Sequence, residues 1–248
     1  MSSAIVVRKC QALEEFQLCL ALQMEIWQEA ELETEPVTAF VVAANTGGQV
    51  LGAFDGERLA GFTLAVVGLR DGVPYLHSHM TGVHSDYRDR GVGRALKLFQ
   101  REEALSRGIR LICWTFDPLE FRNAYFNFNR LGAISRKYLP NFYGITTSPL
   151  HRGIATDRLL AEWHLESPRV DAAVAGISQS GPQYAVGVDI PPSHGKSSGT
   201  EQNGQQVTDL QGRLRQEFSK YFCKGYAAVA VRNDPVAPAY LLAPWSDF

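Results

Sequence analysis

The stretch from Val83 to Leu96 constrains the fold more than any other part of the chain. A β-like segment ends at Val83, a short polar turn follows, and a helical pattern begins at once. The turn contains Gly91 and Gly93, the residue type that lets a backbone approach a ligand closely. This order of strand, glycine turn and helix predicts an α/β fold with a ligand site at the end of the strand.

The same turn predicts an anion site. The first N–H groups of a helix have no partner within the helix, and the helix dipole adds partial positive charge there. Three arginines add formal charge. We therefore expect a pyrophosphate to bind at Arg88, Asp89, Arg90, Gly91, Val92, Gly93 and Arg94.

Three different kinds of turn fit this stretch less well. An ordinary strand-to-helix turn with solvated arginines would need no ligand. A dinucleotide-binding turn needs a third glycine where Leu96 stands, and the Gly-Lys-Ser/Thr of a P-loop is absent from the motif.

Composition excludes several classes of protein. The chain has 248 residues, of which 45% are hydrophobic, so it can bury a large core in one or two domains. A formal net charge of −2 argues against a general nucleic-acid binder. The four cysteines are scattered, which favours reduced thiols over disulfides or a zinc site. Without a signal-peptide pattern or a long apolar run, we expect a cytoplasmic protein that does not enter a membrane.

Hydrophobic periodicity predicts alternating strands and helices in the first 165 residues. Asp55-Gly56 and Asp71-Gly72 are expected hairpin turns, and Gly108 is the expected end of the central helix. The expected strands are 5–8, 50–54, 58–69, 73–83 and 109–116, and the expected helices are 13–29, 93–108 and 121–131.

The pattern changes after residue 165. We expect residues 1–165 to form the catalytic domain and 166–248 an extension that completes the sheet or a pocket wall. Within the extension, 191–206 is rich in Gly, Ser, Gln and Pro and is typical of a mobile loop. A strand over 186–190 is expected before it, and a helix over 208–224 and a hairpin of 226–231 and 240–243 after it.

The motifs resemble those of the GNAT (Gcn5-related) N-acetyltransferases. Arg88-x-x-Gly91-x-Gly93 is similar to the pyrophosphate loop of that family. Asn123 and Gly132 match the helix that precedes the family's fifth strand, and the segments 138–144 and 156–159 resemble a bacterial branch. The resemblance covers residues 1–165. It implies a mixed, largely antiparallel sheet flanked by helices, with acetyl-CoA or another acyl-CoA as co-substrate, and we expect no metal.

The resemblance also implies site residues. Backbone groups of Thr81, Gly82 and Val83 are expected to bind the pantetheine arm and the thioester, and Asn123 to lie near the cofactor. The family's glutamate base corresponds to His77. Its tyrosine acid corresponds to Phe128, which has no proton to donate, so Tyr125 becomes the candidate acid, with core packing as the alternative.

Residue chemistry gives His77 or His79 the role of base. An unperturbed imidazole titrates near pH 6.5, which suits removal of a proton from an ammonium. In a regular strand, His77 and His79 share one face with Thr81 and Val83. Structural histidines remain the alternative, and a metal site here lacks a carboxylate or cysteine partner.

The predicted reaction is N-acyl transfer, with acetyl-CoA as donor and a small-molecule amine or amino acid as acceptor. The acidic run from Glu29 to Glu35 could attract a cationic amine, and Arg122, Arg130, Arg136 and Lys137 a carboxylate. N-succinyl transfer, a non-catalytic CoA-binding module and a homodimer are left open.

Overall fold

The computed structural model describes residues 4–28, 30, 33–147, 153–177, 186–189, 201–234 and 236–245. The chain divides into two compact units. Unit 1 is Met1–Cys113 with Thr147–Arg152, and unit 2 is Trp114–Thr146 with Gly153–Phe248.

Unit 1 is an antiparallel sheet with helices on both faces. Strands β1, β2, β3 and β4 are adjacent in that order and antiparallel, and β4 pairs in parallel with the start of β5 through Leu76–Ile112 and His77–Cys113. The unit contains, in chain order, β1 (Val6–Lys9), α1 (Leu13–Trp27), α2 (Val37–Asn45), β2 (Gln49–Asp55), β3 (Arg58–Arg70), β4 (Val73–Val83), α3 (Val92–Ser106) and the first half of β5 (Leu111–Phe116).

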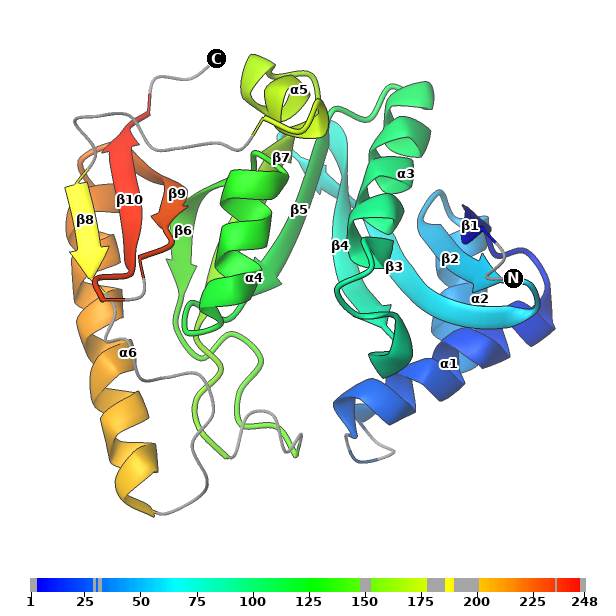
Figure 1. Ribbon diagram of the computed structural model, residues 1–248, viewed down its shortest axis with the longest axis horizontal. Coiled ribbons are helices and arrows are strands. Elements are labelled where there is room, and N and C mark those ends of the chain that lie inside the picture. The colour runs from blue at the N-terminus through cyan, green and yellow to red at the C-terminus, as the bar shows by residue number, and fades with distance from the viewer. Residues whose placement is uncertain are drawn as a thin grey trace. The chain divides into compact units, whose positions relative to one another are not determined.

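Two apolar clusters fix the layers of unit 1. On one face, Phe16 and Cys19 of α1 and Phe40 of α2 pack with Phe62 of the sheet. On the other face, Leu96 of α3 packs with a second cluster of sheet residues. The central sheet is therefore covered by α1 and α2 on one side and by α3 on the other (Figure 1).

A β-bulge interrupts β4 at His79. Leu64 of β3 pairs with Met80, whereas the next residue, Ala65, pairs with Ser78. His79 is therefore an extra residue, opposite which β3 places no partner. A bulge of this kind breaks the alternation of side chains along a strand.

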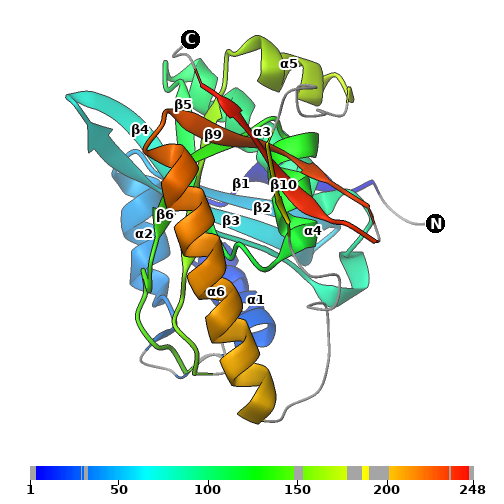
Figure 2. The ribbon, with the colours of Figure 1, turned by 90° about the vertical axis from the view of Figure 1, so that its left-hand side faces the viewer.

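Unit 2 combines mainly antiparallel strands with a long helix. Its strands are adjacent in the order β7, β6, β9, β10 and β8, and β6–β7, β6–β9, β9–β10 and β10–β8 pair antiparallel. Helix α6 packs across these strands (Figure 2). The elements are α4 (Phe121–Tyr125) with a π-helical turn (Phe126–Arg130), β6 (Ile134–Leu139), β7 (Arg158–His164), α5 (Pro168–Val174), β8 (Val186–Asp189), α6 (Glu201–Phe222), β9 (Tyr226–Arg232) and β10 (Ala239–Pro244).

The predicted fold class is confirmed, and several boundaries agree closely. The strand predicted over 73–83 is β4, and the helix predicted over 93–108 is α3, which is followed by Gly108 at φ +74°. The extension continues the sheet of unit 2, since β9 pairs with β6. The domain boundary at residue 165 stays a prediction.

Other elements differ from prediction. Helices α2 and α5 and strands β6 and β7 were not predicted. The loop predicted over 191–206 is partly wrong, because α6 begins at Glu201; residues 191–200 lie outside the described residues. Among the described residues, none of the helices has the length and apolar character needed to span a bilayer.

Candidate functional site: the turn between β4 and α3

The turn after β4 has the geometry of an anion site. β4 ends at Val83, a single 3-10 turn covers Ser85–Tyr87, and α3 begins at Val92 with Gly91 as its N-cap. Gly91 has φ +82°, a left-handed conformation that favours glycine. Within the described part of the chain, no side chain caps the first turn of α3. The predicted order of strand, turn and helix is confirmed.

The space around the two glycines is open. Among the described residues, a Cβ atom built on Gly91 would meet no atom within 4 Å, and one on Gly93 would lie 3.7 Å from a methyl group of Val83. The first intrahelical bond is donated by Ala95 to the Gly91 carbonyl. The N–H groups of Val92 and Gly93 therefore have no acceptor within the helix, and an anion can approach them.

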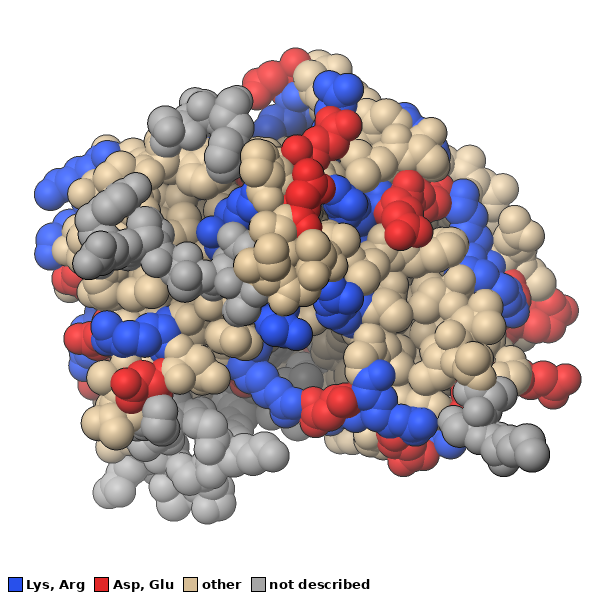
Figure 3. Space-filling view, turned by 45° about the horizontal axis from the view of Figure 1, so that its top comes forward, with Lys and Arg blue, Asp and Glu red and all other residues tan. Residues whose placement is uncertain are grey.

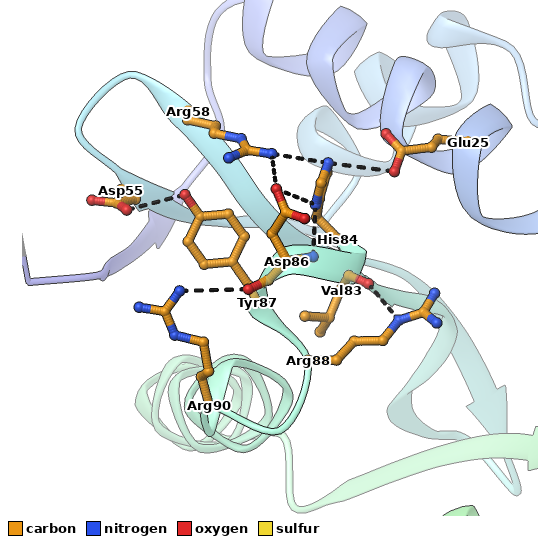
Figure 4. A network of polar contacts seen from close by, with 9 residues as sticks. All are labelled: Glu25, Asp55, Arg58, Val83, His84, Asp86, Tyr87, Arg88 and Arg90. Carbon is orange, nitrogen blue, oxygen red and sulfur yellow. Dashed lines mark hydrogen bonds and ion pairs between the residues drawn. The ribbon is translucent and has the colours of Figure 1, made fainter. Parts of the chain in front are cut away.

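A polar network holds the turn in place (Figure 4). The Asp86 N–H donates to His84 Nδ1 over 3.1 Å, and Arg58 Nη2 donates to Asp86 Oδ2 over 2.7 Å. The other ring nitrogen of His84, Nε2, lies 3.1 Å from Arg58 Nη2 and 3.4 Å from Glu25 Oε1. The hydrogen bond from Arg58 lowers the pKa of Asp86. This network joins β3 and α1 to the turn.

The arginines of the turn lie around Tyr87 and Val83. Arg88 Nε is 3.4 Å from the Val83 carbonyl oxygen, and Arg90 Nη1 is 3.5 Å from that of Asp86 (Figure 4). Arg90 also lies over the Tyr87 ring, at 5.1 Å from its centroid, and Tyr87 donates to Asp55. Both backbone contacts are long, so the guanidinium groups can turn toward an anion. Arg94 lies in the first turn of α3, and Asp89 adopts φ +63°.

Charge elsewhere on the surface is mixed. On the face shown in Figure 3, described Lys and Arg side chains are interspersed with Asp and Glu. The cationic character of the turn is therefore a local feature of a chain whose formal net charge is −2.

The last residues of β4, from Ser78 to Val83, contact β3 and α1 and have one strand edge to which a ligand could bind. Thr81 Oγ1 lies 3.1 Å from Thr63 Oγ1. A Cβ on Gly82 would come within 2.7 Å of the terminal methyl of Ile26, so a larger residue here would force that side chain of α1 to shift. Among the described residues, the register of β4 with β5 includes Leu76 and His77 and does not continue into Ser78–Val83. Backbone groups on this edge can bond an extended ligand.

The expectation that His77, His79, Thr81 and Val83 share one face is wrong. Ser78 bonds to Lys97 of α3, whereas Met80 packs against the cluster formed by α1 and α2. Residues two apart therefore lie on opposite faces at this point, because His79 is the extra residue of the bulge. His77 and His79 remain neighbours, with ring centroids 6.3 Å apart, but Thr81 and Val83 belong to the α3 face.

The two histidines differ in environment. Burial, with contributions from the charges of His79 and Lys97, lowers the pKa of His77 to about 4. His79 is 3.0 Å from Glu35 Oε1 through Nε2. Glu35 lies 44 residues from His79 in the chain, so only folding brings the two together. Of the predicted acidic run, Glu29 and Glu31 lie outside the described residues.

The remaining predicted residues lie in unit 2. Asn123 is exposed and Tyr125 half-buried, both on α4. Phe128 is fully buried, with ring centroids 5.6 Å from Phe116 and 6.1 Å from Tyr240. Phe128 therefore belongs to the core. The roles of Asn123 and Tyr125 stay predictions.

Two further tyrosines of unit 2 carry hydroxyls with polar partners. The Tyr138 hydroxyl donates to Asp157 Oδ2 over 2.7 Å, and burial together with this bond raises its pKa. The Tyr143 hydroxyl lies 2.8 Å from Thr115 Oγ1. Tyr138 is thus a poor proton donor for a departing thiolate.

The comparison with protein families agrees with this geometry. The model described as the Acetyltransferase (GNAT) family matches residues 12–128, which include β4, the glycine turn and α3. These residues belong to the GNAT family. The protein is accordingly an acyltransferase. No curated protein matches the chain by sequence.

Solved structures agree on the fold of the GNAT domain. The ribosomal-protein-S18-alanine N-acetyltransferase from Escherichia coli has a TM-score of 0.52 at 15% identity, covering 66% of this chain and 96% of that one. Arabidopsis thaliana NAA60 in complex with acetyl-CoA has a TM-score of 0.53 at 16% identity, covering 65% and 99%. About a third of this chain therefore extends beyond what these relatives cover.

Proposed function

We propose that the protein transfers an acetyl group from acetyl-CoA to the primary amine of a small molecule or amino acid. The observation that carries this proposal is the uncapped N-terminus of α3, where left-handed Gly91 follows the turn after β4. The match of residues 12–128 to the GNAT family supports acetyl transfer as the reaction. The complex of a structural relative with acetyl-CoA supports acetyl-CoA as the donor.

Pyrophosphate binding follows from the turn. The N–H groups of Val92 and Gly93 and the dipole of α3 favour the negatively charged oxygens of a pyrophosphate. Arg88 and Arg90 add formal charge to the same turn. From there, the edge of β4 from Val83 back to Ser78 offers backbone groups to the two amides of a pantetheine arm, which directs the thioester toward the bulge at His79.

The proton of the attacking amine goes to His79. Its Nε2–H donates to Glu35, which orients the ring and leaves Nδ1 as the acceptor. His77 is a weaker base, because its pKa is about 4. The amine nitrogen then forms a bond to the thioester carbon, the carbon–sulfur bond breaks, and CoA leaves as a thiolate.

Protonation of the thiolate needs no dedicated tyrosine. A free thiol titrates near pH 8.5, so a thiolate can leave without full protonation. Phe128 stands where the family's tyrosine is expected, and its burial supports a step assisted by solvent or by the proton taken from the amine.

The test is release of CoA thiol with pools of primary amines and amino acids, followed by mass spectrometry of the products. We expect products heavier by one acetyl group with acetyl-CoA. Succinyl-CoA in a parallel reaction distinguishes the acyl group. CoA binding without turnover on any amine would contradict the proposal and favour a binding module.

The base is tested by pH profiles of kcat/KM. We expect His79→Ala and Glu35→Gln to lower kcat/KM, with a loss of about 10²–10⁴-fold for His79→Ala. His77→Ala serves as the matched control, and its acidic limb should follow that of the wild type. If the pH profile of kcat/KM is unchanged in His79→Ala, a group other than His79 accepts the proton of the attacking amine.

A further inference from the structure

A cavity lies in unit 1, at the C-terminal end of α3. It measures about 410 Å³, and its walls come from the β1–α1 connection, the α2–β2 turn, β2 and the last turns of α3. This volume suits a small metabolite. A helix rises about 1.5 Å per residue, so Glu103 and Arg107 lie roughly 18–24 Å from Gly91. The cavity is therefore separate from the CoA turn.

Charged side chains line this cavity. The Glu103 carboxylate, whose side chain is 8% exposed, accepts bonds from Lys9 Nζ over 2.6 Å and from Arg107 Nη2 over 2.8 Å. It also accepts a bond from Gln49 Nε2. Two cations thus share one carboxylate, which leaves an excess of positive charge.

A buried amide side chain also lines the cavity. Gln49 is 3% exposed, and its Oε1 has no hydrogen-bond partner among the described residues. A buried carbonyl oxygen without a donor is unfavourable, and a donor from a ligand would remove that cost. Phe16, Ala44 and Val50 supply an apolar wall beside it.

We propose that this cavity binds a free α-amino acid as an effector. Lys9 and Arg107 are placed for its carboxylate, Gln49 Oε1 and Glu103 for its ammonium, and the apolar wall for its side chain. A zwitterion matches this combination of two cations, one carboxylate and one unused carbonyl. A simple anion would leave Gln49 Oε1 without a donor.

Hydrogen bonds connect the cavity to β4. Gln49 Nε2 donates to the Gln100 carbonyl oxygen over 3.2 Å. The Gln100 side chain accepts from Lys97 Nζ over 3.0 Å, and the same ammonium donates to Ser78 Oγ over 2.8 Å. Ser78 directly precedes the bulge at His79. A ligand that reorients Gln49 therefore acts on the strand that carries the proposed base.

Calorimetry with L-leucine, L-lysine and L-glutamate, each without CoA, tests the site. We expect at least one of them to bind the wild type, and Gln49→Met and Arg107→Met to weaken that binding at least tenfold. Gln23→Met is the matched control, since Gln23 is 1% exposed, its amide is unpartnered among the described residues, and it does not line the cavity. Thermal melts of the three variants report on folding.

The effector role has its own readout. The bound amino acid should change the Kd for CoA at least threefold in the wild type, and Lys97→Met should remove that change while keeping amino-acid binding. Absence of binding by all three amino acids, or binding that survives both cavity variants, overturns the site. An unchanged Kd for CoA in the wild type overturns the effector role. Failure of CoA itself to bind would count against the proposed function and leave the amino-acid result standing.

Discussion

At its N-terminal end α3 presents glycines and backbone N–H groups, whereas from Lys97 onward it presents buried charged and amide side chains. Gly91 is exposed, with open space around its α-carbon, while Lys97 and Glu103 are 4% and 9% exposed. The N-terminal end can hold charge with groups that every helix has. The turns from Lys97 onward hold charge with particular side chains whose partners come from β1, β2 and β4.

This difference decides how each region responds to substitution. A site built from backbone groups is blocked by adding a side chain and is little affected by removing one. A site built from buried side chains depends on each of them, because burial strengthens electrostatic interactions and penalises an unpaired group. Substitutions at the two ends of α3 should therefore differ in kind as well as in size.

The largest effect is expected at Gly91. Gly91→Glu introduces negative charge at the pyrophosphate position and should weaken CoA binding at least about 100-fold, measured by calorimetry. Gly91→Asn is the matched control, because asparagine tolerates the left-handed conformation and adds no charge. It should retain most of the affinity. If Gly91→Glu bound CoA with the affinity of the wild type, CoA would not bind at this turn.

Sequence reasoning succeeded where local pattern decides the structure. Gly91, Gly93 and Gly108 mark the turn and the end of α3, and the boundaries of β4 were predicted correctly. It failed at His79, because the alternation rule cannot detect a bulge. It also missed the partners Glu35 of His79 and Gln49 of Glu103, which lie 44 and 54 residues away in the chain. Helix α2 was missed because its short run of apolar and β-branched residues has no polar face.

The buried lysine of α3 should make the stability of the protein depend strongly on pH. Burial lowers the pKa of Lys97 to about 7, from 10.5. Between these values the unfolded chain binds the extra proton, so stability should rise with pH. We expect a gain on the order of 3 kcal/mol between pH 6.5 and 9.5, from urea unfolding, and almost none in Lys97→Met. Lys220→Met, at an exposed lysine, should keep the wild-type slope. A free energy of unfolding that stays constant over this pH range in the wild type would contradict the lowered pKa of Lys97.

The same lysine should act on His77. Burial is the main cause of its lowered pKa, and the charges of His79 and Lys97 add to it. Lys97→Met should therefore raise the pKa of His77 from about 4, as measured by NMR titration of the imidazole. The change should be smaller than the total shift, because burial remains. If the pKa of His77 stays the same, the charge of Lys97 does not reach β4.

The smallest effect is expected from the polar network at the exposed end of α3. Arg58 bonds to Asp86, and their side chains are 52% and 59% exposed. Exposed ion pairs are weak and screened by salt, so Arg58→Met should lower CoA affinity only about two- to fivefold. The loss in CoA affinity should be smaller at high salt, because salt screens the exposed Arg58–Asp86 ion pair in the wild type. His84 and the backbone of the turn keep their own bond, which preserves the conformation of Ser85–Tyr87. A loss comparable with that of Gly91→Glu would mean that side chains, rather than the backbone of α3, provide the anion site.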